Sequence, residues 1–304
     1  MKRFLTKILV IALVTCCTTC FAPQVFASGQ SSTEEPLVIA ISVTNLANQF
    51  WVSWTDALQS ECDELGYTLI IHDAKGDVAN QITALENWIT QQVDAVIIAP
   101  VDADALQTTV DEAMNYGVAI IDAATRLKNY TAYIGVDQYT YGYSIGNCAA
   151  EWINANLADK ETVKAAILND PTQKNMIERS QGIMDGLLEN CDNVQIVAEQ
   201  QAYTADDGVT AAETILQANA DIDCFVGIND SAMLGAYEAV ISSGMDTSKM
   251  CLVACDGDSR ALQLVADGTC YRGTVAIDVL ATAHLNLWQA IDAAHGKAVE
   301  DVKT

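Results

Sequence analysis

The sequence predicts an α/β fold of two doubly wound, parallel-sheet lobes joined by a multi-strand hinge. Short, almost wholly apolar runs alternate with longer helical patterns, which is typical of a parallel sheet covered by helices on both faces. Several helical patterns end at a glycine, as at Gly66 and Gly117, where a left-handed residue can close the last turn. The series stops near residue 137 and then begins again, which indicates a second lobe.

The first predicted lobe begins with a buried strand over 37–43, followed by a helix that ends at Leu65. The same pattern continues with strands over 67–73, 94–99 and 118–123 and with helices over 81–91 and 103–116. A short strand over 133–136 ends this series.

The second predicted lobe opens with a helix over 141–158. It continues with strands over 163–168, 194–198, 224–228, 251–254 and 274–277 and helices over 175–188, 208–218, 231–243, 259–266 and 279–294. We expect crossings near 137–138 and 276–277, which gives lobes of 28–137 plus 278–304 and of 138–277. Facing carboxyl edges of two such lobes form a cleft that can close on a small ligand.

Residues 1–27 resemble an export signal rather than part of the fold. Lys2, Arg3 and Lys7 precede an apolar core over 8–14, and Ala27 ends a small-residue cleavage site. The core is shorter than the ~20 residues that span a bilayer. We therefore expect export to the periplasm or cell envelope. A lipid anchor stays open as an alternative, because three cysteines lie at a suitable depth: Cys16, Cys17 and Cys20.

The charge balance is strongly acidic. The chain has a formal charge of −25, and loss of the three signal cations leaves about −28. Such a charge repels nucleic acid and anionic membranes, so we expect neither as a partner. We expect a soluble monomer.

The cysteines and histidines do not predict a metal site. Ten cysteines minus the three in the signal leave seven, an odd number that cannot all pair within one chain. Most resemble small buried apolar residues; Cys191 and Cys224 are the one pair worth testing for a disulfide. The three histidines are isolated in the sequence.

The loop over 44–51 carries the most information about function. It leaves the carboxyl end of the first strand, where open α/β sheets bind ligands. Its candidates are Thr44, Asn48, Phe50 and Trp51. Neighbouring aromatics on a helix point about 100° apart, so one of Phe50 and Trp51 should face the core and the other a ligand.

Polar residues also follow the strands of the second lobe. We expect Asp230 to cap the next helix, which leaves the Asn229 amide free to bind hydroxyls. Asp256 is a candidate carboxylate for adjacent hydroxyls, with Asp258 or Ser259 as the next helix cap. Arg179 lies within a predicted helix, where it could equally be an exposed residue.

No motif indicates catalysis or a cofactor. The sequence has no GxxxxGK[ST], HExxH or GxGxxG pattern. It has no GxSxG nucleophile elbow either, because its one GxSxG match, at 142–146, lies inside the predicted helix over 141–158 and not at a strand-to-helix turn. Pairs of carboxylates such as Asp206 and Asp207 lie at predicted helix starts, where the helix dipole favours them. The sequence therefore predicts binding rather than an enzyme.

Over nearly all of 37–296 the chain resembles exported sugar-binding proteins of the ribose/galactose type, which serve ABC importers. The order and spacing of several motifs carry this resemblance: Thr-Asn-Leu-Ala-Asn-Gln-Phe-Trp at 44–51, Gly-Tyr-Thr-Leu at 66–69, Gln-Ile-Thr-Ala-Leu-Glu-Asn at 81–87, Ala-Val-Ile-Ile-Ala-Pro-Val-Asp-Ala-Asp-Ala at 95–105, Tyr-Ile-Gly-Val-Asp at 133–137, Glu-Arg-Ser-Gln-Gly at 178–182, Gly-Ile-Asn-Asp-Ser-Ala-Met-Leu-Gly-Ala at 227–236 and Cys-Asp-Gly at 255–257. The resemblance implies two Rossmann-like lobes of the type I periplasmic binding protein fold.

The resemblance also implies roles for individual residues. It implies an amide and aromatic clamp in the first lobe at Asn48, Phe50 and Trp51. In the second lobe it implies ligand contacts at Tyr203, Arg179, Asn229 and Asp256.

The chain departs from the family pattern at several positions. The usual Asp-Arg pair is reduced to Arg126, because alanine occupies position 124; Asp122, on the same strand, is a possible partial substitute. A frequent amide is replaced by Ala99, and a frequent glutamine by Ile277 or Asp278. These losses argue against ribose and favour another sugar, a deoxy sugar, a polyol or a non-sugar metabolite. The family usually continues into one more strand and crossing, so we expect a truncated or atypical C-terminus.

The resulting prediction is an exported substrate-binding protein that captures a monosaccharide-like ligand and docks on the permease of an ABC importer. A sensor that presents its closed form to a receptor or histidine kinase stays open as the main alternative. A LacI-type regulator is disfavoured by the signal and the lack of a basic helix-turn-helix, and an enzyme by the lack of any motif.

Overall fold

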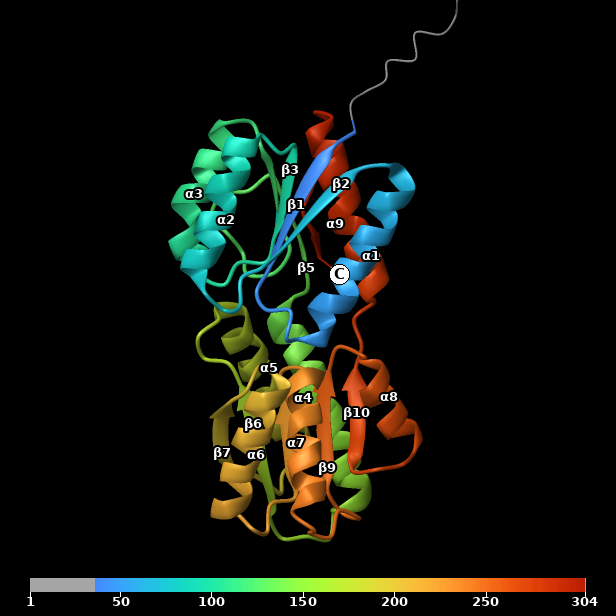
Figure 1. The fold of residues 1–304 in the computed structure, drawn as a ribbon. Helices are drawn as coiled ribbons and strands as arrows, with labels where there is room; N and C mark the ends of the chain where they lie inside the picture. The colour runs from blue at the N-terminus through green and yellow to red at the C-terminus, as the bar shows by residue number, and fades with distance from the viewer. Residues whose placement is uncertain (1–35, 304) are drawn as a thin grey trace, which may run out of the picture. The chain divides into compact units, whose positions relative to one another are not determined.

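The computed structural model describes residues 36–303, which contain two parallel β-sheets with helices on both faces (Figure 1). The predicted α/β fold with two doubly wound sheets is therefore confirmed. The predicted export signal and its three cysteines lie outside the described residues. No helix within 36–303 is both long and apolar enough to cross a membrane.

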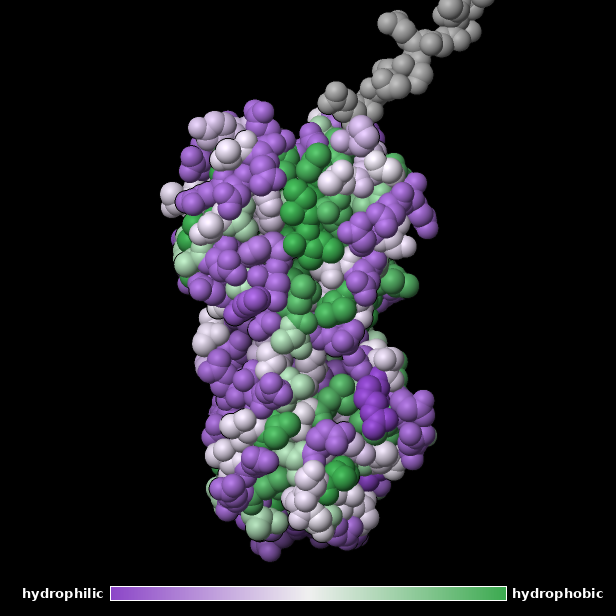
Figure 2. Space-filling model, viewed as in Figure 1, coloured by the Kyte–Doolittle hydropathy of each residue, from purple (hydrophilic) through white to green (hydrophobic). Residues whose placement is uncertain are grey.

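Six parallel strands form the first sheet, in the order β11-β5-β4-β3-β1-β2. They are β1 (Val38–Val43), β2 (Thr68–Asp73), β3 (Ala95–Ile98), β4 (Ala119–Asp122), β5 (Ala132–Gly135) and β11 (Val302–Lys303). Strands β1, β3, β4 and β5 are almost wholly apolar and buried, because helices cover both of their faces. Strand β2 lies at the edge, and Figure 2 shows apolar surface over the β1–β2 region, where Ile71 is exposed.

Five parallel strands form the second sheet, in the order β10-β9-β8-β6-β7. They are β6 (Val163–Asn169), β7 (Val194–Gln201), β8 (Cys224–Gly227), β9 (Cys251–Cys255) and β10 (Tyr271–Val275). The chain passes between the sheets at 136–137 and 276–278. We propose the predicted lobe boundaries on the strength of this division of the strands between the sheets.

The helices that accompany the first sheet are α1 (Gln49–Leu65), α2 (Val78–Gln91), α3 (Ala103–Asn115) and α9 (Val279–Ala294). Those of the second sheet are α4 (Gln138–Asn156), α5 (Lys174–Asn190), α6 (Ala205–Ala218), α7 (Asp230–Ser242) and α8 (Ser259–Ala266). Three helices begin three residues earlier than predicted, because the side chains of Asp77, Asp137 and Thr204 accept first-turn N–H groups.

Helices α4 and α5 approach each other backbone to backbone. A Cβ added at Gly142 would lie 2.0 Å from the Arg179 carbonyl oxygen, and one at Gly182 would lie 2.1 Å from the Tyr139 carbonyl oxygen. Only glycine allows such an approach. The close packing brings the first residue of α4, Gln138, beside the Arg179 side chain of α5.

Two expectations about covalent structure and the C-terminus need correction. All seven cysteines within 36–303 are free thiols, so the candidate Cys191–Cys224 disulfide is absent. The C-terminal segment does contain one further strand, because Val302 and Lys303 pair in parallel with Ile134 and Gly135 of β5.

Candidate functional site

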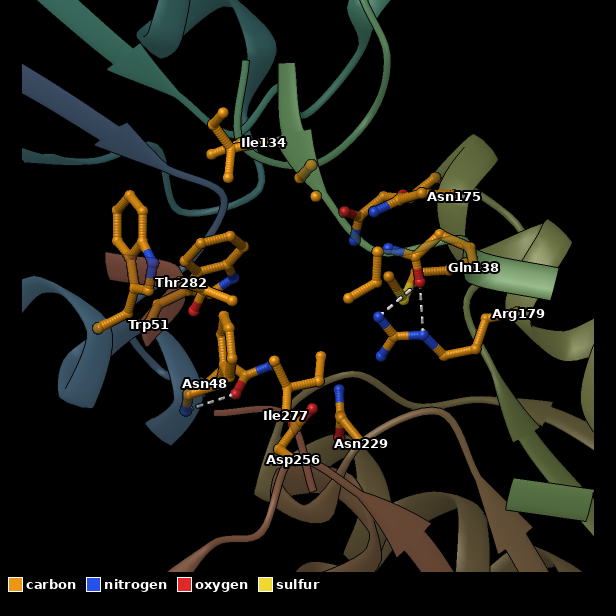
Figure 3. Close-up of a pocket in the computed structure, with 18 of the residues that line it drawn as sticks. Asn48, Trp51, Ile134, Gln138, Asn175, Arg179, Asn229, Asp256, Ile277 and Thr282 are labelled. Carbon is orange, nitrogen blue, oxygen red and sulfur yellow. Dashed lines mark hydrogen bonds between the residues drawn. The ribbon is translucent and has the colours of Figure 1, made fainter. Parts of the chain in front are cut away.

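A cavity lies between the carboxyl edges of the two sheets, with side chains from both lobes around it (Figure 3). The volume of the cavity is about 60 Å³, whereas one buried water needs roughly 10–15 Å³. The cavity therefore has room for a small molecule. Of the predicted site residues, it is lined by Asn48, Phe50, Trp51, Arg179, Tyr203, Asn229 and Asp256.

Aromatic rings from α1 form one side of the cavity. Phe50 and Trp51 meet edge to face with ring centroids 5.0 Å apart, and Trp51 meets Trp54 in the same way at 5.6 Å. Trp51 is buried in the apolar core while Phe50 is only partly buried, yet both rings line the cavity. We expected one ring to face the core and the other to face a ligand. Trp51 does both, because it packs in the core and also lines the cavity.

Four hydrogen bonds join the lobes beside the cavity. The Tyr203 hydroxyl accepts from the Trp51 indole N–H at 2.9 Å and lies 3.0 Å from the Thr44 hydroxyl. The Ser231 hydroxyl accepts from the Gln49 backbone N–H at 3.0 Å and donates to Asn48 Oδ1 at 3.1 Å. These contacts describe a closed arrangement of the lobes. Thr44 was a predicted ligand-binding residue, but its hydroxyl contacts Tyr203 of the other lobe and its side chain does not line the cavity.

Arg179 lies on the side of the cavity opposite Trp51 (Figure 3). It is buried rather than exposed, and its Nε and Nη2 donate to the Gln138 side-chain oxygen at 2.9 and 2.7 Å. Its Nη1 donates to the Ile228 carbonyl at 2.7 Å, and its guanidinium lies 4.9 Å from the Tyr141 ring centroid. A guanidinium has five N–H groups. Nη1 also donates to Cys255 Sγ at 3.5 Å, so these four bonds leave one N–H group for a ligand.

Asp256 is the only acid among the residues that line the cavity, and Arg179 is the only base. Burial raises the pKa of Asp256 to about 8, against the opposing effect of the Arg179 charge. Its backbone has a φ of 108°, a region that side-chain-bearing residues rarely adopt, and such strain is frequent at functional sites. With its carboxyl ionised, Asp256 balances the Arg179 charge, and this arrangement suits a neutral ligand with hydroxyl groups.

Asn229, not Asp230, caps helix α7. Asn229 Oδ1 accepts from the Ala232 N–H at 2.8 Å, and Asn229 Nδ2 donates to the Tyr203 backbone oxygen at 3.0 Å. Asp230 instead accepts from three donors: the Tyr271 and Thr274 hydroxyls and the Asp258 N–H. The predicted cap at Asp230 is therefore wrong. The predicted cap at Asp258 is confirmed, because it accepts from the Arg260 N–H at 2.7 Å.

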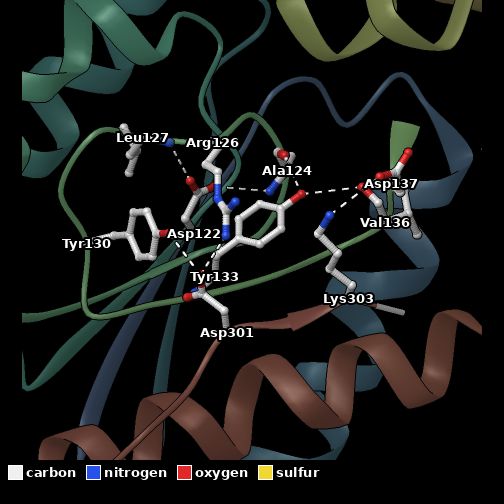
Figure 4. A network of polar contacts seen from close by, with 10 residues as sticks. All are labelled: Asp122, Ala124, Arg126, Leu127, Tyr130, Tyr133, Val136, Asp137, Asp301 and Lys303. Carbon is white, nitrogen blue, oxygen red and sulfur yellow. Dashed lines mark hydrogen bonds and ion pairs between the residues drawn. The ribbon is translucent and has the colours of Figure 1, made fainter. Parts of the chain in front are cut away.

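Asp122 and Arg126 do not line the cavity. Figure 4 shows the contacts that they make instead. The fully buried Asp122 carboxylate accepts from the Ala124 and Leu127 N–H groups at 3.2 and 2.6 Å, so it shapes the loop after β4. Arg126 forms an ion pair with Asp301 at 2.5 Å and stacks over the Tyr133 ring at 4.6 Å. The C-terminal segment thus holds this arginine away from the site.

Sequence reasoning missed several cavity residues: Trp54, Gln138, Gln173, Asn175, Met176, Thr282 and Asn286. Asn175 lies one helical turn before Arg179, so the four-residue spacing could have indicated it. Asn286 lies inside α9, far from any strand end, and no pattern in the sequence singles it out.

Comparisons with known proteins agree with this geometry. The family described as "Periplasmic binding protein domain" matches residues 39–298. The ribose import binding protein RbsB of Bacillus subtilis is 31% identical, with 99% of this chain and 96% of that protein covered.

Two solved structures are also similar. A protein from Mycobacterium smegmatis in complex with β-D-fucofuranose has 27% identity and a TM-score of 0.80, covering 88% of this chain and 89% of that one. An ABC transporter solute-binding protein from Bacillus halodurans with bound myo-inositol has 26% identity and a TM-score of 0.76, covering 88% of this chain and 92% of that one.

Proposed function

Because the chain belongs to the periplasmic binding protein family, we propose that it captures a neutral monosaccharide or a similar polyol in the cavity between its lobes and delivers it to an ABC importer. The family consists of binding components of transporters, so the chain is a binding protein and not an enzyme. Relatives of this chain carry names or bound ligands that are sugars or cyclitols, which supports a ligand of the same chemical class.

The observation that carries this proposal is the composition of the cavity. Aromatic rings line one side, as suits the C–H face of a sugar ring. Arg179 lies on the opposite side, and together with Asp256, which also lines the cavity, it offers a donor and an acceptor for hydroxyl groups. When the Asp256 carboxyl is ionised, its charge balances that of Arg179, so the cavity favours a neutral ligand over an amino acid or a sugar phosphate.

Ligand binding and lobe closure are coupled in this proposal. A ligand that contacts both lobes has its full set of partners only when the lobes are closed, so binding shifts the population toward the closed form. The closed form would then present surfaces of both lobes to the permease. We propose, on the evidence of the predicted export signal, that the protein acts outside the cytoplasmic membrane. We also propose that it acts as a monomer.

The proposal is tested by a thermal-shift screen of the purified protein against neutral pentoses, hexoses, deoxy sugars, cyclitols and nucleosides, with amino acids and sugar phosphates as charged controls. A ligand at 100 times its Kd should stabilise the fold by about 2.7 kcal/mol. For a domain pair of this size that is a rise in Tm of roughly 2–4 °C per kcal/mol. A rise with a charged control alone, or with none of the compounds, would reject a neutral sugar as the ligand.

A further inference from the structure

Two buried amide oxygens in the cavity have no hydrogen-bond partner, one from each lobe. They are Asn175 Oδ1 on α5 and Asn286 Oδ1 on α9. Both side chains are more than nine-tenths buried, with 6% and 2% of their surface exposed. A buried acceptor without a donor is costly, so these atoms mark positions that a ligand donor is expected to occupy.

We propose that Asn175 and Asn286 determine the specificity of the site, and that its ligand is a deoxy sugar with a methyl group in place of a hydroxymethyl group. The inference rests on the proposed function and names the class of sugar. In it, one ligand hydroxyl donates to each asparagine, and the deoxygenated carbon contacts the apolar first-lobe wall, defined as Trp51, Trp54, Ala124 and Ile134.

The second-lobe asparagine lies on the same side of the cavity as Arg179. Asn175 precedes Arg179 by one helical turn, so both side chains lie on the same face of α5. Figure 3 shows both on the side of the cavity opposite Trp51. A donor from Arg179 and acceptors from Asp256 and Asn175 therefore serve the hydroxyl-bearing edge of a ring.

The first-lobe asparagine is isolated among apolar groups. Its Nδ2 donates to the Thr282 carbonyl at 2.8 Å, which orients Oδ1 as the free acceptor. The other first-lobe polar side chains are already engaged, since Asn48 Oδ1 accepts two hydrogen bonds and the Thr282 hydroxyl donates to the Val279 carbonyl. Asn286 Oδ1 is thus the one unpartnered buried side-chain oxygen on this side of the cavity within the described residues.

The first-lobe wall selects against an additional hydroxyl. Its four side chains form part of one apolar cluster. Their only polar groups are the two indole N–H groups, and that of Trp51 already donates to Tyr203. The polar groups expected nearby are elsewhere: position 124 is alanine, and Arg126 pairs with Asp301. A hydroxymethyl oxygen against Ala124 and Ile134 would lose water without gaining a side-chain partner, whereas a methyl group there gains from burial.

Matched sets of sugars test the inference without any mutation. Within each set the ring configuration is constant and only the substituent on C5 changes: D-fucose, D-galactose and L-arabinose; L-fucose, L-galactose and D-arabinose; L-rhamnose, L-mannose and L-lyxose; 6-deoxy-D-allose, D-allose and D-ribose. Isothermal titration calorimetry should show, in the set with the correct configuration, that the methyl sugar binds about 10-fold or more tightly than the other two members.

Variants test the two asparagines. Asn175→Leu and Asn286→Leu should each weaken binding of the preferred sugar by about 10-fold or more, because each removes the acceptor of one ligand hydroxyl. Asn115→Leu, at an exposed position on α3, is the control and should leave affinity unchanged. Ligand analogues that each lack one hydroxyl provide a second readout, measured on the unmodified protein. Removal of the hydroxyl that binds Asn175, or of the one that binds Asn286, should cause a similar loss of affinity. When that analogue is tested on the Leu variant of the same asparagine, affinity should not fall further.

The outcomes separate this inference from the proposed function. Tightest binding of a hexose or pentose, or full affinity in both Leu variants, would overturn the inference while the protein remained a sugar-binding protein. Failure of every neutral sugar to bind would overturn both.

Discussion

The Tyr203 hydroxyl and the Trp51 indole N–H form a hydrogen bond of 2.9 Å that joins the second lobe to the first. The same hydroxyl lies 3.0 Å from the Thr44 hydroxyl, so one phenol links two first-lobe residues. Both rings also line the cavity. A residue expected to contact only the ligand therefore also contributes to closure, and its effects on ligand affinity and on lobe closure are coupled.

Tyr203→Phe should weaken ligand binding by roughly 5- to 30-fold. The change keeps the ring but leaves the buried Trp51 N–H without its acceptor, a loss of about 1–2 kcal/mol. Calorimetry measures the affinity, and small-angle scattering measures the lobe closure that should decrease in parallel. Tyr116→Phe, at a tyrosine with 70% of its surface exposed, is the matched control. Equal affinity in Tyr203→Phe and the parent would show that this bond does not support the bound state.

Ligand affinity should fall as the pH is lowered from 8 to 6. Burial raises the pKa of Asp256 to about 8 when the lobes are closed and the cavity holds no ligand, whereas ligand hydroxyls donate to the ionised carboxylate and so favour deprotonation. Affinity should decrease by up to about tenfold per pH unit below that pKa. Titrations in buffers with different ionisation enthalpies would count the protons released.

Asp256→Asn is the control for this pH dependence. It should bind about 10-fold or more weakly at pH 8, with a much flatter pH profile. Burial also raises the pKa of Asp230, to about 7, and any dependence left in the variant would belong to that second carboxyl group. An unchanged pH profile in Asp256→Asn would assign the effect to a group other than Asp256.

The site illustrates what sequence can and cannot predict. The loop over 44–51 was predictable because strand, loop and helix are adjacent in the chain, and the same holds for Asp256 after β9. The position of Arg126 outside the cavity was not predictable. Its partner Asp301 is 175 residues away and reaches it only because β11 pairs with β5. The place of Asn286 in the cavity was not predictable either. It is a mid-helix residue, and it reaches the cavity only because α9 packs against α1 and the first sheet.

Arg126→Ala should leave ligand affinity unchanged within about twofold. Its side chain is 49% exposed and pairs with Asp301, away from the cavity. Exposed ion pairs contribute only about 0–1 kcal/mol, so Tm should also change little. Calorimetry with the preferred sugar checks the first result and thermal unfolding the second. A tenfold loss of affinity would reinstate Arg126 as a ligand-binding residue.

Asn229→Ala should destabilise the fold by about 1–2 kcal/mol. The variant removes the N-cap of α7 and the bond from the Asn229 amide to the Tyr203 backbone oxygen. Chemical unfolding measures the change, with Asn115→Ala on the surface of α3 as the control. If stability were unchanged and only affinity fell, Asn229 would act mainly on the ligand.

The residue that caps a helix can also depend on contacts that are distant in the sequence. The sequence order Asn229-Asp230-Ser231 offers three good caps in a row, and local preference alone cannot rank them. The choice depends on Tyr271 and Thr274, because their hydroxyls and the Asp258 N–H bind Asp230 from β10 and the loop after β9. The alternation of apolar strands and helices, in contrast, is a local pattern, and it predicted both sheets.

The most direct test of the central claim is a crystal structure of the protein with the neutral sugar that raises its Tm most. We predict the sugar ring between Trp51 and Arg179, with ligand oxygens within hydrogen-bond distance of Asp256. A ligand bound outside the cavity between the lobes would contradict the claim.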